Sequence, residues 1–154
     1  MTETVRRASL NDLDEIAQIC LTWEKAPASK NPVQLGKFLS EALADPDAMW
    51  YLAEVDGKPV GFAHVQYIPR PVRLGWRAIV EELHVLPGYG NQLEALLAAG
   101  VADAQKRGDI IAIYLLTQPD LEPRRFDMYE RLGFKERGRE VLVWAGDLSK
   151  SSPH

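Results

Sequence analysis

The sequence predicts one mixed α/β (α+β) domain, in which helices flank a central mixed sheet that is mostly antiparallel. Helical and strand-like patterns alternate along most of the 154 residues, with only short turn segments between them. Hydrophobic residues make up 46% of the chain, which suits one core of ordinary size. The chain also has no internal repeat and no low-complexity block. We therefore expect a single domain over residues 1–148 and a flexible tail over residues 149–154.

The N-terminal part is expected to contain a short strand, at residues 5–8, and two amphipathic helices. Ser9 and Asp12 have the spacing of a helix capping box, and an apolar stripe with helical spacing follows over residues 13–20. The second helix is expected to begin at Pro32, because proline is favoured at the first helical position.

A β-hairpin is expected next, because two strand-like segments flank a tight-turn sequence. The segments are residues 49–55 and 60–68, and Asp56 and Gly57 lie between them. A loop rich in proline and arginine follows. Residues 76–86 then have the pattern of a longer strand.

A strand–helix–strand unit continues the chain. Asn91 and Glu94 have capping-box spacing at the start of the next helix, and Gly108 is placed to end it. The dense aliphatic run at residues 110–116 suits a central strand covered on both faces. Any phosphate-bearing ligand would suit the N-terminus of this helix, where free N–H groups and the positive end of the dipole point outward.

The C-terminal part predicts a short helix at residues 123–132, ended by Gly133, and two last strands at residues 134–137 and 141–145. With these elements, the expected sheet has about seven strands and about four helices beside it.

Composition excludes several classes of function. Eighteen Lys and Arg residues oppose 22 Asp and Glu residues, giving a formal net charge of −4. Nucleic-acid binding is not expected, because it requires a basic surface that neutralises phosphates. A membrane span is not expected either, because no stretch reaches the roughly 18 apolar residues that it needs.

The reactive side chains point to a reducing compartment and to no metal. Cys20 is the only cysteine and lies on an apolar helical stripe, so we expect a core residue in a cytoplasmic protein. No apolar segment follows the N-terminal arginines, so no signal peptide is predicted. The three histidines lack the spacing of metal ligands.

Two motifs carry a resemblance to a known family. The first is EELHVLP at residues 81–87, ahead of a glycine-containing turn and a helix, and the second is MYERLGF at residues 128–134. With this order of elements, nearly the whole chain resembles the GNAT superfamily of N-acetyltransferases. The resemblance implies the acyl-CoA N-acyltransferase fold. It also implies acetyl-CoA as cosubstrate and direct transfer of the acetyl group, in a ternary complex, to a primary amine of a small molecule or peptide.

The resemblance also implies how coenzyme A would be held. Backbone N–H groups of the glycine-containing loop and of the helix start would bind its pyrophosphate. The pantetheine would insert between two splayed strands, and a main-chain N–H near Val85 would polarise the acetyl carbonyl. The candidate cofactor-binding residues lie at the strand end and in the loop: Leu83, Val85, Leu86, Gly88, Tyr89, Gly90, Asn91 and Gln92.

Four residues are candidates for proton transfer. Tyr129, with an ordinary pKa of about 10, would protonate the leaving thiolate; a packed aromatic is the structural alternative. Glu81 and Glu82 are adjacent on a strand, so they are expected on opposite faces, and the one that faces the cleft would be the base, with Glu82 preferred. His84 shares a face with Glu82 and is the other candidate base. A salt bridge or a solvated charge is the alternative for both glutamates.

The loop departs from the family pattern Gln/Arg-x-x-Gly-x-Gly/Ala. The segment GYGNQ at residues 88–92 is about two residues short and contains no arginine. Glu122 and Arg125 also replace the family's Asn-x-x-Ala ahead of the tyrosine. A GNAT-like binding module with an altered coenzyme A loop, catalytically weak or inactive, is therefore the alternative function. The sequence is silent on the oligomer, although exposed edge strands in this family often pair as homodimers.

Overall fold

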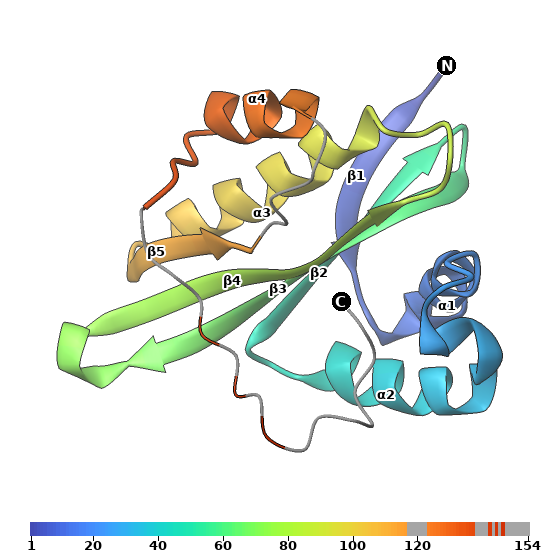
Figure 1. Cartoon of the computed structure of the whole chain (residues 1–154), viewed down its shortest axis with the longest axis horizontal. Coiled ribbons are helices and arrows are strands. Elements are labelled where there is room, and N and C mark those ends of the chain that lie inside the picture. The colour runs from blue at the N-terminus through green and yellow to red at the C-terminus, as the bar shows by residue number, and fades with distance from the viewer. Residues whose placement is uncertain (117–122, 138–141, 143, 145, 147–154) are drawn as a thin grey trace.

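The computed structural model describes residues 1–116, 123–137, 142, 144 and 146. Their elements form one layered α+β domain, which confirms the predicted fold class: a sheet with α1 and α2 on one face and α3 and α4 on the other (Figure 1). The elements are β1 (Glu3–Ala8), α1 (Leu13–Leu21), α2 (Pro32–Ala44), β2 (Ala48–Val55), β3 (Lys58–Arg70), β4 (Gly75–Val85), α3 (Gln92–Arg107), β5 (Ile110–Leu115) and α4 (Pro123–Arg131).

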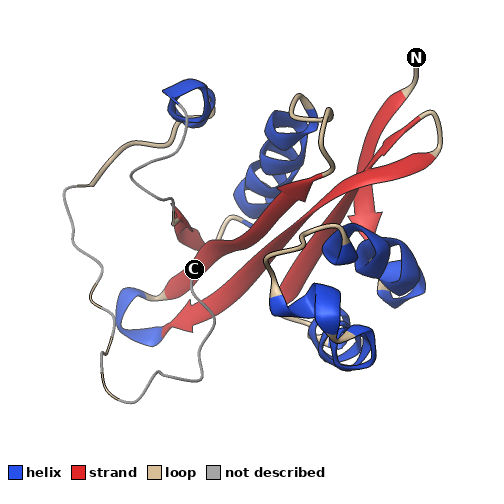
Figure 2. Cartoon of the chain, turned by 45° about the vertical axis from the view of Figure 1, so that its right-hand side comes forward, coloured by secondary structure: helices blue, strands red, loops and turns tan. Residues whose placement is uncertain are grey.

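The described sheet has five strands in the order β1-β2-β3-β4-β5. The first four strands form an antiparallel meander, and β5 runs parallel to β4 after the crossover through α3. Figure 2 shows the strands running between the two groups of helices. No helix in the described residues is both long and apolar enough to cross a membrane.

Each face of the sheet has its own apolar core. On the α3 and α4 face, the fully buried side chains include Tyr51, Val65 and Leu96. On the α1 and α2 face, Ile16 packs with Phe62 and other sheet residues. Strand alternation sends neighbouring residues to opposite faces, so each face packs against its own helices.

The β2–β3 turn forms as predicted. Asp56 and Gly57 have φ values of 50° and 79°, the left-handed conformation that two-residue hairpin turns require. The predicted helix ends are also observed, because Gly108 and Gly133 have positive φ values just after α3 and α4.

The predicted capping box at Ser9 and Asp12 is present and starts the short 3-10 turn before α1. The Ser9 N–H donates to Asp12 Oδ2 at 2.9 Å, and the Asn11 N–H donates to Ser9 Oγ at 3.3 Å. Arg6 also donates to both carboxylate oxygens of Asp12, at 2.8 and 3.1 Å. These hydrogen bonds hold the pKa of Asp12 below its usual range, with Arg6 as the largest cause.

Two predictions about the C-terminal strands are corrected. Residues 134–137 form no strand. Three of these four residues have charged, exposed side chains, so the segment has no apolar face that could pack in a sheet. Among the described residues, strand β5 lies at the edge of the sheet and not at its centre, and Ile111 on this strand is 47% exposed. The predicted strand at residues 141–145 and the tail at residues 149–154 lie largely outside the described residues.

Asp12 is expected to support the native state only while it is ionised. Because its folded-state pKa is lowered, its contribution is present above its ordinary pKa of about 3.9 and is lost as the pH falls through the lowered value. Asp12→Asn should therefore reduce the free energy of unfolding by about 1 kcal/mol at pH 7, and by less below about pH 4. Urea unfolding at both pH values would measure this difference.

Asp14→Asn is the matched control, because Asp14 is exposed and has no side-chain hydrogen bond or ion pair in the described residues. If Asp12→Asn costs no more than Asp14→Asn at pH 7, the Arg6–Asp12 pair does not stabilise the fold.

Candidate active site

The central feature of the site is the divergence of β4 from β5. The two strands pair from Trp76 and Ile110 as far as Val80 and Leu115, but β4 continues to Val85. Residues 81–85 therefore have a strand neighbour only on the β3 side among the described residues.

The β3 pairing shows which backbone groups face the open side. The Leu86 N–H donates to the Val60 carbonyl at 2.8 Å, and the register continues with Gly61 opposite Val85. Because backbone groups alternate in direction along a strand, the N–H and C=O groups of Leu83 and Val85 point away from β3. The open edge of β4 can thus hydrogen-bond to an extended ligand.

A β-bulge on β4 corrects the prediction for the two glutamates. Glu82 lies opposite His64 and Val80 lies opposite Val65, so Glu81 is the extra residue. A bulge breaks the regular alternation of side chains. In such a bulge two residues oppose one, so Glu81 and Glu82 both lie opposite His64. His64 stacks on Trp50, which belongs to the core on the α1 and α2 face. The two carboxylates therefore share one face and do not lie on opposite faces.

The protein environment favours the uncharged form of several groups on this face. Partial desolvation of its carboxyl raises the pKa of Glu82, and the negative charge of Glu81 raises it further, although the Glu82 residue as a whole is exposed. Burial likewise raises the pKa of Cys20 to about 12, with a further contribution from Glu82. Burial lowers the pKa of His64, which stacks on Trp50. A carboxyl with a raised pKa is suited to accept a proton near neutral pH.

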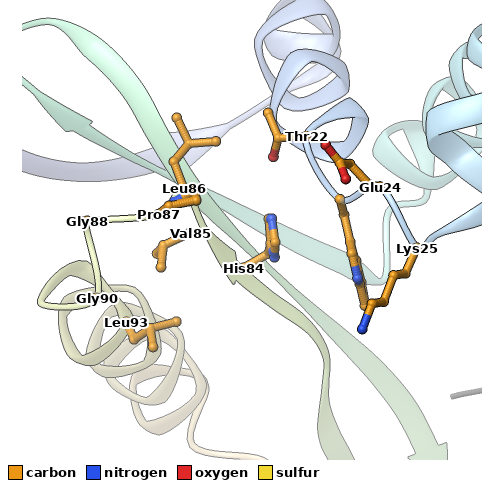
Figure 3. A pocket seen from close by; sticks show the side chains of 11 residues that line it. Thr22, Glu24, Lys25, His84, Val85, Leu86, Pro87, Gly88, Gly90 and Leu93 are labelled. Atoms are coloured by element: carbon orange, nitrogen blue, oxygen red, sulfur yellow. The ribbon is translucent and has the colours of Figure 1, made fainter.

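A cleft of about 620 Å³ opens between the end of β4 and the segment after α1 (Figure 3). His84 stacks on the exposed indole of Trp23, with ring centroids 5.5 Å apart and planes 11° apart. Thr22, Glu24 and Lys25 approach from the same segment. The residues that line the cleft are Thr22, Trp23, Glu24, Lys25, His84, Val85, Leu86, Pro87, Gly88, Gly90 and Leu93.

The loop between β4 and α3 offers free backbone donors. Gly88 has a φ of 88°, a conformation that favours glycine. Among the described residues, the N–H groups of Gly88, Gly90 and Asn91 have no hydrogen-bond partner. Asn91 precedes the first residue of α3, as predicted, but its backbone is helical and its side chain makes no capping bond. The start of α3 is therefore open to an anion.

The structure gathers only part of the predicted site around the cleft. His84, Val85, Leu86, Gly88 and Gly90 line it. The other candidates lie outside the lining. Of the loop residues, Gln92 is 4% exposed, and its N–H donates to the Tyr89 carbonyl.

Tyr129 belongs to the core on the α3 and α4 face. It is 6% exposed and packs edge-on against Phe126 and Phe134. Its place on α4 agrees with the predicted helix, but its side chain is not part of the cleft lining.

A sequence profile described as the Acetyltransferase (GNAT) family matches residues 10–134. The chain belongs to the GNAT acetyltransferase family. No curated protein sequence matches it significantly. The match covers both motifs that suggested the resemblance, and it includes β4, the open loop and α4.

Solved structures support the GNAT fold. A probable acetyltransferase is 21% identical with a TM-score of 0.78, and the match covers 94% of this chain and 99% of that one. A ribosomal-protein-alanine N-acetyltransferase from Brucella melitensis biovar Abortus 2308 is 20% identical with a TM-score of 0.69, covering 93% and 99%. The structure of AAC(6')-Iy in complex with a bisubstrate analogue is 19% identical with a TM-score of 0.73, covering 95% and 99%.

Sequence reasoning missed Thr22, Glu24 and Lys25. They follow the apolar stripe of α1 directly, and nothing in their own pattern marks them as site residues. Their position depends on how α1 packs on the sheet. Only the stop of the helical stripe near Leu21 could have suggested a loop at this place.

Gly61 is expected to be necessary for the shape of the site. A Cβ atom there would lie 2.7 Å from Val85 Cγ1 and 2.9 Å from the His84 carbonyl oxygen, so β4 would have to move. Gly61→Ala should lower the free energy of unfolding by about 1–3 kcal/mol through overpacking. Denaturant unfolding would measure the loss.

Gly36→Ala in α2 is the matched control, because a Cβ atom at Gly36 meets nothing within 4 Å. This substitution should stabilise the protein by about 0.5–1 kcal/mol, as expected for alanine in a helix. Equal effects of the two substitutions would contradict the requirement for close approach at Gly61.

Proposed function

We propose that this protein is an N-acetyltransferase that transfers an acetyl group from acetyl-CoA to a primary amine by direct attack in a ternary complex. The observation that carries the proposal is the open edge of β4 over residues 81–85. This edge leads into the Gly88 loop and the open start of α3. Membership of the GNAT family supports the same reaction class.

The described residues fit coenzyme A in two respects. The open edge of β4 offers the backbone groups of Leu83 and Val85 to an extended arm such as pantetheine. The free N–H groups of Gly88, Gly90 and Asn91 lie at a helix N-terminus, which suits a pyrophosphate. No side chain obstructs the loop at its glycines, since a Cβ at Gly88 or Gly90 would meet nothing within 4 Å.

The chemistry that acetyl-CoA supplies is an acetyl group activated as a thioester. In the proposed mechanism, the Val85 N–H donates a hydrogen bond to the acetyl carbonyl oxygen and stabilises the negative charge that develops there. Glu82 accepts the proton of the attacking amine, directly or through water. Tyr129 donates a proton to the departing sulfur. This step requires the Tyr129 hydroxyl to reach the reacting centre from the core on the α3 and α4 face.

The cleft beside His84 is the proposed place for the acceptor amine. Its lining combines the apolar Trp23 indole with the charged side chains of Glu24 and Lys25, which suits an acceptor that carries both apolar and polar groups. The names of two similar structures suggest peptide amines and aminoglycosides for a first acceptor screen.

Binding of acetyl-CoA is the first test of the proposal. Isothermal titration of the purified protein should give a dissociation constant in the micromolar range, near −8 kcal/mol. Thiol release in the presence of an amine panel then reports transfer. The absence of heat and of a thermal shift at millimolar acetyl-CoA would reject the enzyme and favour the alternative, a GNAT-like binding module with another ligand.

The base is tested by the pH dependence of turnover. Because the pKa of Glu82 is raised, its basic form is lost as the pH falls through that raised value, so kcat/KM should fall on the acidic side. Glu82→Gln should lower kcat on the order of 10²-fold and remove this acidic limb.

Glu81→Gln is the control, since Glu81 lies on the same face and carries the same charge. Because it removes the charge that raises the pKa of Glu82, the acidic limb should remain but move to lower pH. If Glu82→Gln leaves kcat/KM and its pH profile intact, Glu82 is not the base. A loss with Glu81→Gln would then assign the role to Glu81, and a loss only with His84→Gln would assign it to His84.

A further inference from the structure

The candidate coenzyme A loop provides backbone donors but no cation of its own. Residues 86–92 contain no lysine or arginine, although coenzyme A is a polyanion. Backbone N–H groups orient a phosphate, and a nearby cation adds charge neutralisation. A positive charge from another part of the chain would therefore complete the site.

Lys58 brings a cation to this loop. Its Nζ lies 5.6 Å from the centroid of the Tyr89 ring, and Tyr89 is the residue between the two loop glycines. Lys58 is the first residue of β3. Since β3 runs antiparallel to β4, with Gly61 opposite Val85, the beginning of β3 necessarily lies near the end of β4.

The hairpin that carries Lys58 is fixed in place. The Asp56 N–H donates to the Thr2 carbonyl at 2.7 Å, and the Thr2 N–H donates to Asp56 Oδ1 at 2.8 Å. The Asp56 carboxylate therefore already accepts a hydrogen bond from Thr2, the residue before β1. Lys58 is exposed and forms no ion pair with any described residue. Its charge is available to an external anion.

We propose that Lys58 binds a phosphate group of coenzyme A beside the Gly88 loop and supplies the positive charge that the loop lacks. The inference rests on the proposed function, because it assumes that this loop holds coenzyme A. The cation–π contact holds the ammonium over the ring of Tyr89, the residue between Gly88 and Gly90, whose N–H groups have no partner among the described residues. The long lysine side chain can leave the ring and reach the ligand.

Isothermal titration with coenzyme A and with 3′-dephospho-coenzyme A would test this role. Lys58→Gln should weaken coenzyme A binding about tenfold, Lys58→Arg should restore most of it, and the melting temperature should stay unchanged. Lys37→Gln is the matched control, since Lys37 is an exposed lysine on α2 and should have no effect.

The two ligands distinguish the phosphate that is bound. If Lys58→Gln weakens both equally, Lys58 contacts the pyrophosphate; if it weakens only coenzyme A, Lys58 contacts the 3′-phosphate. Wild-type-like binding by Lys58→Gln would overturn the role of Lys58 and leave the proposed function standing. Failure of the wild-type protein to bind coenzyme A would overturn both.

Discussion

The candidate site depends on a single constraint, which is that β4 continues past the point where β5 stops pairing with it. A strand inside a sheet normally forms backbone hydrogen bonds with two neighbouring strands. After Val80, β4 keeps only β3 beside it among the described residues. The bulge at Glu81 adds to this divergence, because a bulge bends its strand and increases the local twist. The unpaired edge then leads directly to the open loop and the start of α3.

The two cores hold this edge in position from opposite sides. Leu83 and Val85 pack toward the core under α3, whereas Leu86 packs toward the core under α1 and α2. Gly61 allows β3 to approach β4 closely at Val85, because a side chain at this position would meet Val85 and the His84 carbonyl oxygen. The packing of α1 brings Trp23 against His84 and closes the far wall of the cleft. A rigid backbone surface and an adaptable side-chain wall therefore face each other across the cleft.

Charge is divided between the two ends of the site. Glu81 and Glu82 make the face toward α1 and α2 acidic, which favours an amine. At the other end, free N–H groups and Lys58 gather where an anion would bind. This separation suits a reaction between an anionic donor and a cationic acceptor, because opposite charges attract each reactant to a different part of the site.

The sequence by itself determined the local features. The Asp56–Gly57 turn, the capping box at Ser9 and the helix-ending glycines follow from short-range backbone sterics and hydrogen bonding, which a few neighbouring residues fix. The family motifs likewise located β4 and its loop. Only the tertiary structure decided where Glu81 points, because a bulge depends on pairing with β3 and resets the alternation that the sequence predicts. For the same reason, the positions of Lys58 beside Tyr89 and of Trp23 against His84 were not predictable, since such contacts join residues whose separation along the chain carries no local signal.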